Sequence, residues 1–106
     1  MSTTHSSVTT VVVQLLQRIN YDKPGVSRQV IAKDEHTTSA LVCIAAGTLI
    51  PEHSAPRTVC LTVLDGCGTL TLEGQDIALE PGVFVRMLPN VPHALQAIDN
   101  LALLHV

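Results

Sequence analysis

Two histidines, His53 and His93, are the residues of this chain whose type and position best suit chemistry. Each lies next to an apolar stretch punctuated by Gly or Pro, in GTLIPEHSAP and in EPGVFVRMLPNVPHA. An imidazole can act as a general acid or base, as a hydrogen-bonding group or as a metal ligand. The pair therefore predicts a binding or metal site or, if each ring only bonds a backbone carbonyl, a structural role. It does not name a reaction.

Two arginines and two further histidines are weaker candidates. Arg57 and Arg86 could contact an anionic ligand, and an arginine inside an apolar strand such as VFVRML is unusual. His36 stands in a polar turn beside acidic residues, which predicts a solvated loop side chain. His105 is expected on the last strand, and nothing in the sequence places it at the site.

The three cysteines, Cys43, Cys60 and Cys67, are odd in number and form no CxxC pair. Cys43 and Cys60 lie in apolar runs and are expected to be small core residues, whereas Cys67 is expected in a more exposed turn. The N-terminal sequence MSTTHSSVTT is polar and lacks the basic start of a secretory signal. Together these features predict a reduced, cytoplasmic protein.

Short apolar stretches separated by Gly, Pro, Asp and Asn predict strands over most of the chain. The expected strands are residues 26–33, 39–45, 59–64, 69–72, 75–79, 83–88, 93–97 and 101–106. Asp65-Gly66 and Glu73-Gly74 are expected as hairpin turns, the second of type I′ or of type I with a bulge. Asp99-Asn100 is expected to join the last two strands. Such short connections favour antiparallel pairing in an all-β sandwich or barrel.

The chain has 106 residues, enough for one domain that buries roughly two-thirds of its unfolded surface. Residues 1–9 are rich in Ser and Thr and are expected to be a flexible N-terminal segment, and residues 10–106 to form the single domain. TVVVQLLQRIN, residues 10–20, is expected to start as a strand and to continue as a short helical turn.

The composition is poor in charge. Only 14% of the residues are charged while 46% are hydrophobic, and the formal net charge is -3. Because soluble domains average roughly 25% charged residues, part of the surface is expected to be covered in a homodimer, with residues 11–16 as a candidate interface. No Lys/Arg run occurs, so nucleic acid and anionic membranes are not expected partners. No stretch reaches the roughly 18 apolar residues of a membrane helix.

The spacing of the glycines and histidines resembles that of the cupin family. The family's first motif, G-x5-H-x-H-x3-E-x6-G, is matched at Gly47, His53 and Gly66. Its second motif, G-x5-P-x-G-x2-H-x3-N, is matched at Gly82 and His93. The two motifs and their linker cover about half of the chain, and PEHSAP resembles a run found in small cupins of unassigned function. The resemblance implies an all-β double-stranded β-helix, or jelly-roll barrel, as a single cupin domain over residues 10–106.

The chain departs from these motifs at the usual metal ligands. Metal-binding cupins use three histidines and a glutamate, but Ala55 and Val59 stand where the second histidine and the glutamate would be. Three further motif positions also differ: Leu88, Asn90 and Ala97. Only His53 and His93 remain, and a stable site usually needs three or four protein ligands. The resemblance thus implies at most a weakly bound divalent transition metal at these two histidines.

Strand alternation predicts that three apolar side chains share the interior with the two histidines: Val59, Leu61 and Val63. Arg86 is added to this candidate pocket because it could meet an anionic group. An apolar interior with convergent imidazoles predicts a module that binds or senses a small molecule. Two alternatives stay open: a metal-dependent cupin enzyme of the dioxygenase or isomerase type, and a structural protein with no ligand. The lost ligands count against the first, and the retained histidines count against the second.

Overall fold

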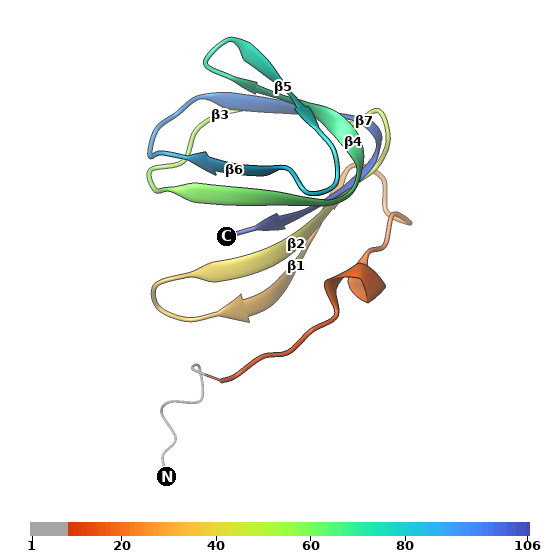
Figure 1. The fold of residues 1–106 in the computed structure, drawn as a ribbon, viewed down its shortest axis with the longest axis vertical. Coiled ribbons are helices and arrows are strands. Elements are labelled where there is room, and N and C mark those ends of the chain that lie inside the picture. The colour runs from red at the N-terminus through yellow and green to blue at the C-terminus, as the bar shows by residue number, and fades with distance from the viewer. Residues whose placement is uncertain (1–8) are drawn as a thin grey trace.

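The computed structural model describes residues 9–106, whose strands form a seven-stranded antiparallel sheet rolled into a barrel (Figure 1). The elements are the 3-10 helix η2 (Leu15–Arg18) and strands β1 (Val26–Lys33), β2 (Thr38–Ile44), β3 (Leu49–His53), β4 (Val59–Leu72), β5 (Gln75–Leu79), β6 (Phe84–Met87) and β7 (His93–His105). The all-β jelly-roll prediction is confirmed. The predicted flexible segment, residues 1–9, lies outside the described residues except for Thr9.

Strands β4 and β7 organise the barrel because each of them takes part in two layers. Residues 93–97 of β7 lie between β3 and residues 68–72 of β4, whereas residues 101–105 lie between β2 and residues 61–66 of β4. β6 pairs with the first part of β4, and β5 with the last. One layer therefore has the order β1-β2-β7-β4-β6 and the other has the order β3-β7-β4-β5 (Figure 1).

Two predicted turns are wrong, because Asp65-Gly66 and Asp99-Asn100 lie inside the long strands β4 and β7. They meet at the corner where both strands pass from one layer to the other, and the register of the pair shifts on either side of Asp65-Gly66. A bulge and a tight turn favour the same residues, since both interrupt the ladder and often need positive φ. Gly66 has φ 86°, as a bulge of this kind requires.

The turn at Glu73-Gly74 is confirmed. Glu73 has φ 48° and Gly74 has φ 83°, and a type I′ turn needs positive φ at both central residues. This turn joins β4 to β5 and leaves their pairing regular from Leu72 and Gln75 onward. The local sequence therefore sets the register of this hairpin.

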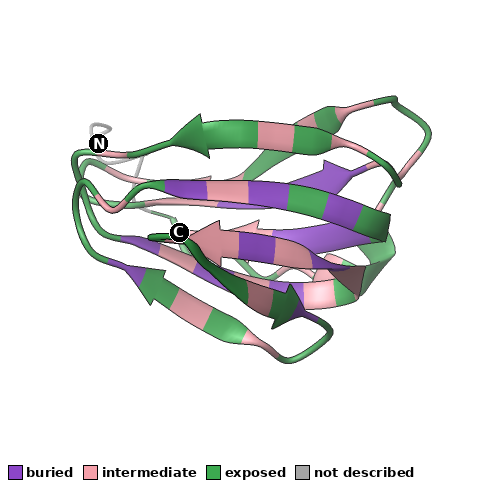
Figure 2. Cartoon of the chain, turned by 90° about the horizontal axis from the view of Figure 1, so that it is seen from above, coloured by how far each residue is buried: buried purple, intermediate pink, exposed green. Residues whose placement is uncertain are grey.

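The core lies between the two layers, and it consists of every second residue of the long strands. Buried residues alternate with more exposed ones along much of β4 and at the start of β7 (Figure 2). Val59, Leu61 and Val63 of β4 all belong to this core, with Leu101 and Leu103 of β7 facing the same interior. Most of the apolar surface that stabilises the fold is removed from water here.

The N-terminal residues cover part of the outer face of the first layer. Ile19 and Tyr21 pack against a second apolar cluster that includes Leu41 and Cys43. The Tyr21 hydroxyl donates to Asp65 Oδ2 at 2.6 Å, and burial together with this bond raises the pKa of Tyr21 well above its ordinary value. The expected helical turn is present as η2, but no strand forms over residues 10–13.

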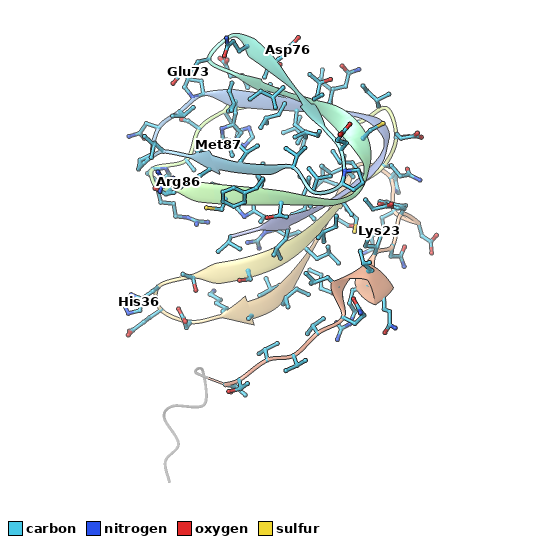
Figure 3. The ribbon with its side chains drawn as sticks, viewed as in Figure 1. Lys23, His36, Glu73, Asp76, Arg86 and Met87 are labelled. Carbon is cyan, nitrogen blue, oxygen red and sulfur yellow. The ribbon has the colours of Figure 1, made fainter. Side chains whose placement is uncertain are left out.

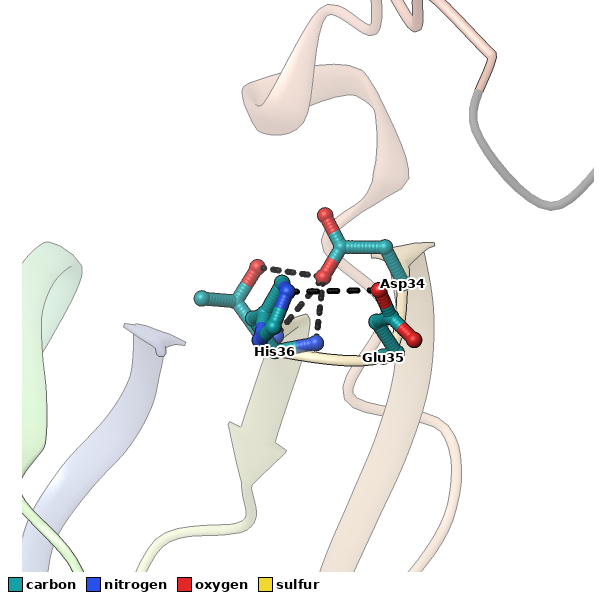
Figure 4. A network of polar contacts seen from close by, with 4 residues as sticks. Asp34, Glu35 and His36 are labelled. Atoms are coloured by element: carbon teal, nitrogen blue, oxygen red, sulfur yellow. Dashed lines mark hydrogen bonds and ion pairs between the residues drawn. The ribbon is translucent and has the colours of Figure 1, made fainter.

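The turn between β1 and β2 is held by a small network of polar contacts around Asp34 and His36 (Figure 4). The backbone N–H groups of Thr37 and His36 each donate to Asp34 Oδ1 at 2.8 Å, and these bonds hold the pKa of Asp34 below its usual value. His36 Nε2 lies 3.3 Å from Glu35 Oε1, with both side chains exposed. His36 is thus a solvated loop residue, as the sequence predicts.

The three cysteines are free thiols. Cys43 is buried, as expected, whereas Cys60 and Cys67 are half-buried and Cys67 lies within β4 rather than in a turn. Among residues 9–106, no helix is long and apolar enough to cross a membrane.

Candidate functional site

The pairing of β3 with β7 brings His53 and His93 face to face. β3 ends at His53 and β7 begins at His93, and in this antiparallel pair the two residues are direct partners. Their ring centroids are 4.2 Å apart and the ring planes are tilted by 59°. Side chains that are far apart in the sequence thus form one imidazole pair at the end of the barrel.

Each ring of the pair bonds the backbone through the same nitrogen. His53 Nδ1–H donates to the carbonyl oxygen of Pro51, and His93 Nδ1–H donates to that of Val91, each at 3.0 Å. A carbonyl oxygen can only accept, so Nδ1 carries the hydrogen in both rings. In the neutral ring, Nε2 is then left as an acceptor. The hydrogen bonds to backbone carbonyls that a structural role would require are therefore present. They use only one of the two nitrogens of each ring.

The pair stands at the end of an apolar cavity of about 90 Å³. Apart from histidines, its walls are aliphatic side chains and one methionine, among them Leu61, Leu70 and Leu103. His93 is 9% exposed, whereas His53 is exposed to solvent. His53 therefore marks the mouth of the cavity, and His93 extends the polar group inward.

The other predicted pocket residues are placed differently. Leu61 lines the cavity, but Val59 and Val63 are core residues that do not reach it. Arg86 is exposed on β6, next to the buried Met87, which does line the cavity (Figure 3). Because adjacent strand residues point to opposite faces, Arg86 lies on the outside of the barrel and does not join the imidazole pair.

His105 lines the same cavity, a position that the sequence alone did not predict. β7 is one strand, so its alternation continues through Asp99-Asn100, and His93, Leu103 and His105 all face the interior. Counting every second residue from His93 through Asp99-Asn100 would have placed His105 on the inner face. The apparent turn at Asp99-Asn100 hid that signal.

The donors of the cavity do not fit a metal centre of the kind that the cupin resemblance implies. Val59 is buried where a glutamate would stand, and Ala55 packs against the core where a histidine would stand. Within residues 9–106, no three His, Cys, Asp or Glu side chains are arranged to hold one metal ion. Two imidazole nitrogens alone make an incomplete ligand set. Weak metal binding at His53 and His93 stays a prediction.

Solved structures share this architecture across nearly the whole chain. A conserved protein of unknown function from Streptococcus pyogenes aligns with a TM-score of 0.79 at 20% identity, over 92% of this chain and 86% of its own. A cupin superfamily protein from Desulfitobacterium hafniense gives 0.80 at 19% identity, over 88% and 85%. KdgF from Halomonas sp. gives 0.70 at 22% identity, over 79% and 81%. At these identities the likeness concerns the fold alone.

Sequence comparison leads to the same family. No curated protein matches the chain. The family model described as "Cupin domain" matches residues 40–106, which include both histidine motifs and every strand from β3 to β7. With the jelly-roll topology and the imidazole pair in position, the chain belongs to the cupin family.

Proposed function

We propose that this protein binds a small molecule inside the barrel, through the imidazoles of His53 and His93 and without a metal centre. The observation that carries the proposal is the approach of the two rings, with centroids 4.2 Å apart, at the end of an apolar cavity. Small-molecule sites typically combine apolar walls with a few convergent polar groups. The residues of this cavity have that composition.

The cavity limits the size of the ligand. A water molecule occupies roughly 30 Å³ of liquid, so a cavity of about 90 Å³ has the volume of about three waters and suits a compact molecule of only a few non-hydrogen atoms. The apolar part of such a molecule would lie against Leu70 and Leu103. Its polar end would lie at the mouth, where a neutral imidazole accepts at Nε2 and a protonated one donates.

The groups that contact the two histidines also favour binding over catalysis. A histidine that acts as a general base is commonly oriented by a carboxylate. Among the described residues no Asp or Glu lines the cavity, and backbone carbonyls orient both rings instead. We therefore favour binding or sensing over the metal-dependent enzyme. The free Nε2 atoms count against a purely structural role.

Isobutyramide, a compact uncharged amide, is a suitable first probe. We expect it to shift the methyl NMR signals of Leu61, Leu70 and Leu103 in untagged protein with EDTA present, saturating at a Kd on the order of millimolar. His53→Ala should weaken this binding about tenfold because one of the two polar partners is lost.

His36→Ala is the matched control, since it removes an exposed imidazole far from the cavity and should leave the affinity unchanged. If the cavity methyl signals stay in place up to the solubility limit of the amide, the binding proposal is wrong. Equal affinities for the wild type and His53→Ala would remove the imidazole pair from the site.

A further inference from the structure

We propose that the ligand of this cavity is a small apolar carboxylate, which His105 contacts together with the imidazole pair and which Arg28 and Arg57 attract. This inference rests on the proposed function and adds the chemical class of the ligand. It is carried by the position of His105, by the distribution of charge around the cavity and by a buried nitrogen that has no partner.

His105 lies on the inner face of the barrel between two neighbouring strands. Its direct partners are Ala40 on β2 and Leu61 on β4, and both His105 and Leu61 line the cavity. The Nδ1 atom of His105 is buried and has no hydrogen-bond partner among the described residues. Such orphaned nitrogens are rare in folded proteins and call for an explanation. A polar ligand atom in the cavity would supply the missing partner for this ring.

His105 does not complete a metal site with the pair, because no three such side chains in residues 9–106 are arranged around one ion. Three imidazoles that line one small cavity could instead contact a ligand group larger than a single ion. A carboxylate presents two oxygens with about four lone-pair positions, and each can accept from a different N–H donor. The Nδ1–H groups of His53 and His93 already donate to backbone carbonyls, so within this pair only a protonated ring can donate to the carboxylate, through its Nε2–H.

The charges near the cavity favour an anion. Within residues 9–106, no acidic side chain lines the cavity. Arg28 pairs with Val42, which lines the cavity from β2. Arg57 lies in the loop between His53, at the end of β3, and the start of β4. Near that start, the Cys60 N–H donates to the backbone oxygen of Val106, the residue after His105. Neither arginine lines the cavity, but both lie close enough to His105 to act on its charge, in a chain whose formal net charge is -3.

The same surroundings link binding to a proton. Burial, then Arg57 and Arg28, and to a lesser degree His93, lower the pKa of His105, so its ring is neutral near pH 7. The other titratable side chains that line the cavity are His53 and His93. A bound carboxylate offsets the two arginines and raises the pKa of His105 again. Binding should then take up a proton, and the affinity should rise as the pH falls.

Isobutyrate and isobutyramide form the matched pair of probes, because they share a shape and differ in charge. With the untagged full chain at pH 7, we expect methyl NMR titrations to show isobutyrate binding at least about fivefold more tightly than isobutyramide. Arg57→Gln should reduce this preference to about twofold or less, and Arg28→Gln is the second variant should Arg57→Gln be unstable. Arg86→Gln removes the same charge from the outer face of β6 and should keep the preference.

The outcomes distinguish this inference from the proposed function. If both probes bind equally, the carboxylate is wrong and small-molecule binding stands. If neither binds, both are wrong. If the preference for isobutyrate over isobutyramide falls as much in Arg86→Gln as in Arg57→Gln, it comes from the total charge of the protein. Arg28 and Arg57 would then have no specific role in binding.

The proton linkage is tested by titrating both probes between pH 8 and pH 6, where a carboxylate ligand stays ionised. We expect the affinity for isobutyrate to rise several-fold toward pH 6 and the affinity for isobutyramide to stay level. His105→Gln, which keeps a polar side chain but does not titrate, should flatten the isobutyrate profile. An unchanged profile in His105→Gln would exclude His105 from the ligand contact.

Discussion

Gly66→Ala is expected to prevent the barrel from folding, or to lower the free energy of unfolding by at least about 4 kcal/mol. A Cβ at this position would overlap the backbone carbonyl oxygen of Asn100 on β7, and φ at Gly66 is 86°, where side chains are strained. The obstructing atom is backbone in the neighbouring strand, so it cannot turn aside. Since domains of this size are stable by about 5–15 kcal/mol, the loss is a large fraction of the total.

Gly74→Ala is the control for this prediction. Gly74 has almost the same φ, 83°, but a Cβ there meets no atom within 4 Å. It should cost only about 1 kcal/mol, from the strained backbone alone. The urea midpoints of the two variants measure the difference, and similar midpoints would show that the close approach of β4 and β7 at Gly66 is not required.

The corner at Gly66, where β4 and β7 pass from one layer to the other, shows which parts of the fold could be predicted from the sequence. β1 and β5 have the predicted bounds, and the Glu73-Gly74 turn has the predicted conformation, because local alternation and turn chemistry decide them. Asp65-Gly66 and Asp99-Asn100 could not be assigned in this way. Their sequences suit a turn equally well, and only the pairing of β4 with β7 makes them bulges within continuous strands.

Some residues of the candidate site could likewise be predicted from the sequence, and others could not. The motif spacing was enough to select His53 and His93, because the β3–β7 pairing that joins them is shared by the fold. His105 depends on alternation through the β7 corner, which the apparent turn concealed. Arg86 was selected by charge and apolar neighbours, although these do not reveal the face of the strand to which a side chain points.

A second large effect concerns the oligomeric state: we propose that the protein is a homodimer. Val12 is 93% exposed and Leu16 is 60% exposed, and both belong to residues 11–16, the predicted interface. A specific interface should bury more than roughly 1,000 Å², and covering these side chains would contribute to it. Light scattering at micromolar concentration should return twice the 11.3 kDa of one chain.

The double variant Val12→Asp, Leu16→Asp should be a monomer, because two carboxylates would have to be desolvated in the interface. Phe84→Asp changes another exposed apolar residue, on β6, and should stay dimeric. A wild-type protein of 11.3 kDa in solution would contradict the proposal. Dissociation by Phe84→Asp alone would move the interface to the face of β6.

The central claim is that the barrel of this cupin works through two imidazoles and a small molecule rather than through a metal centre. Elemental analysis of untagged protein, before and after dialysis against EDTA, tests it most directly. With Ala55 and Val59 in place of two family ligands, we expect substoichiometric transition metal that EDTA removes, while binding of isobutyramide persists. One metal ion per chain that survives EDTA and is absent from His53→Ala would contradict the claim and favour the metal-dependent enzyme.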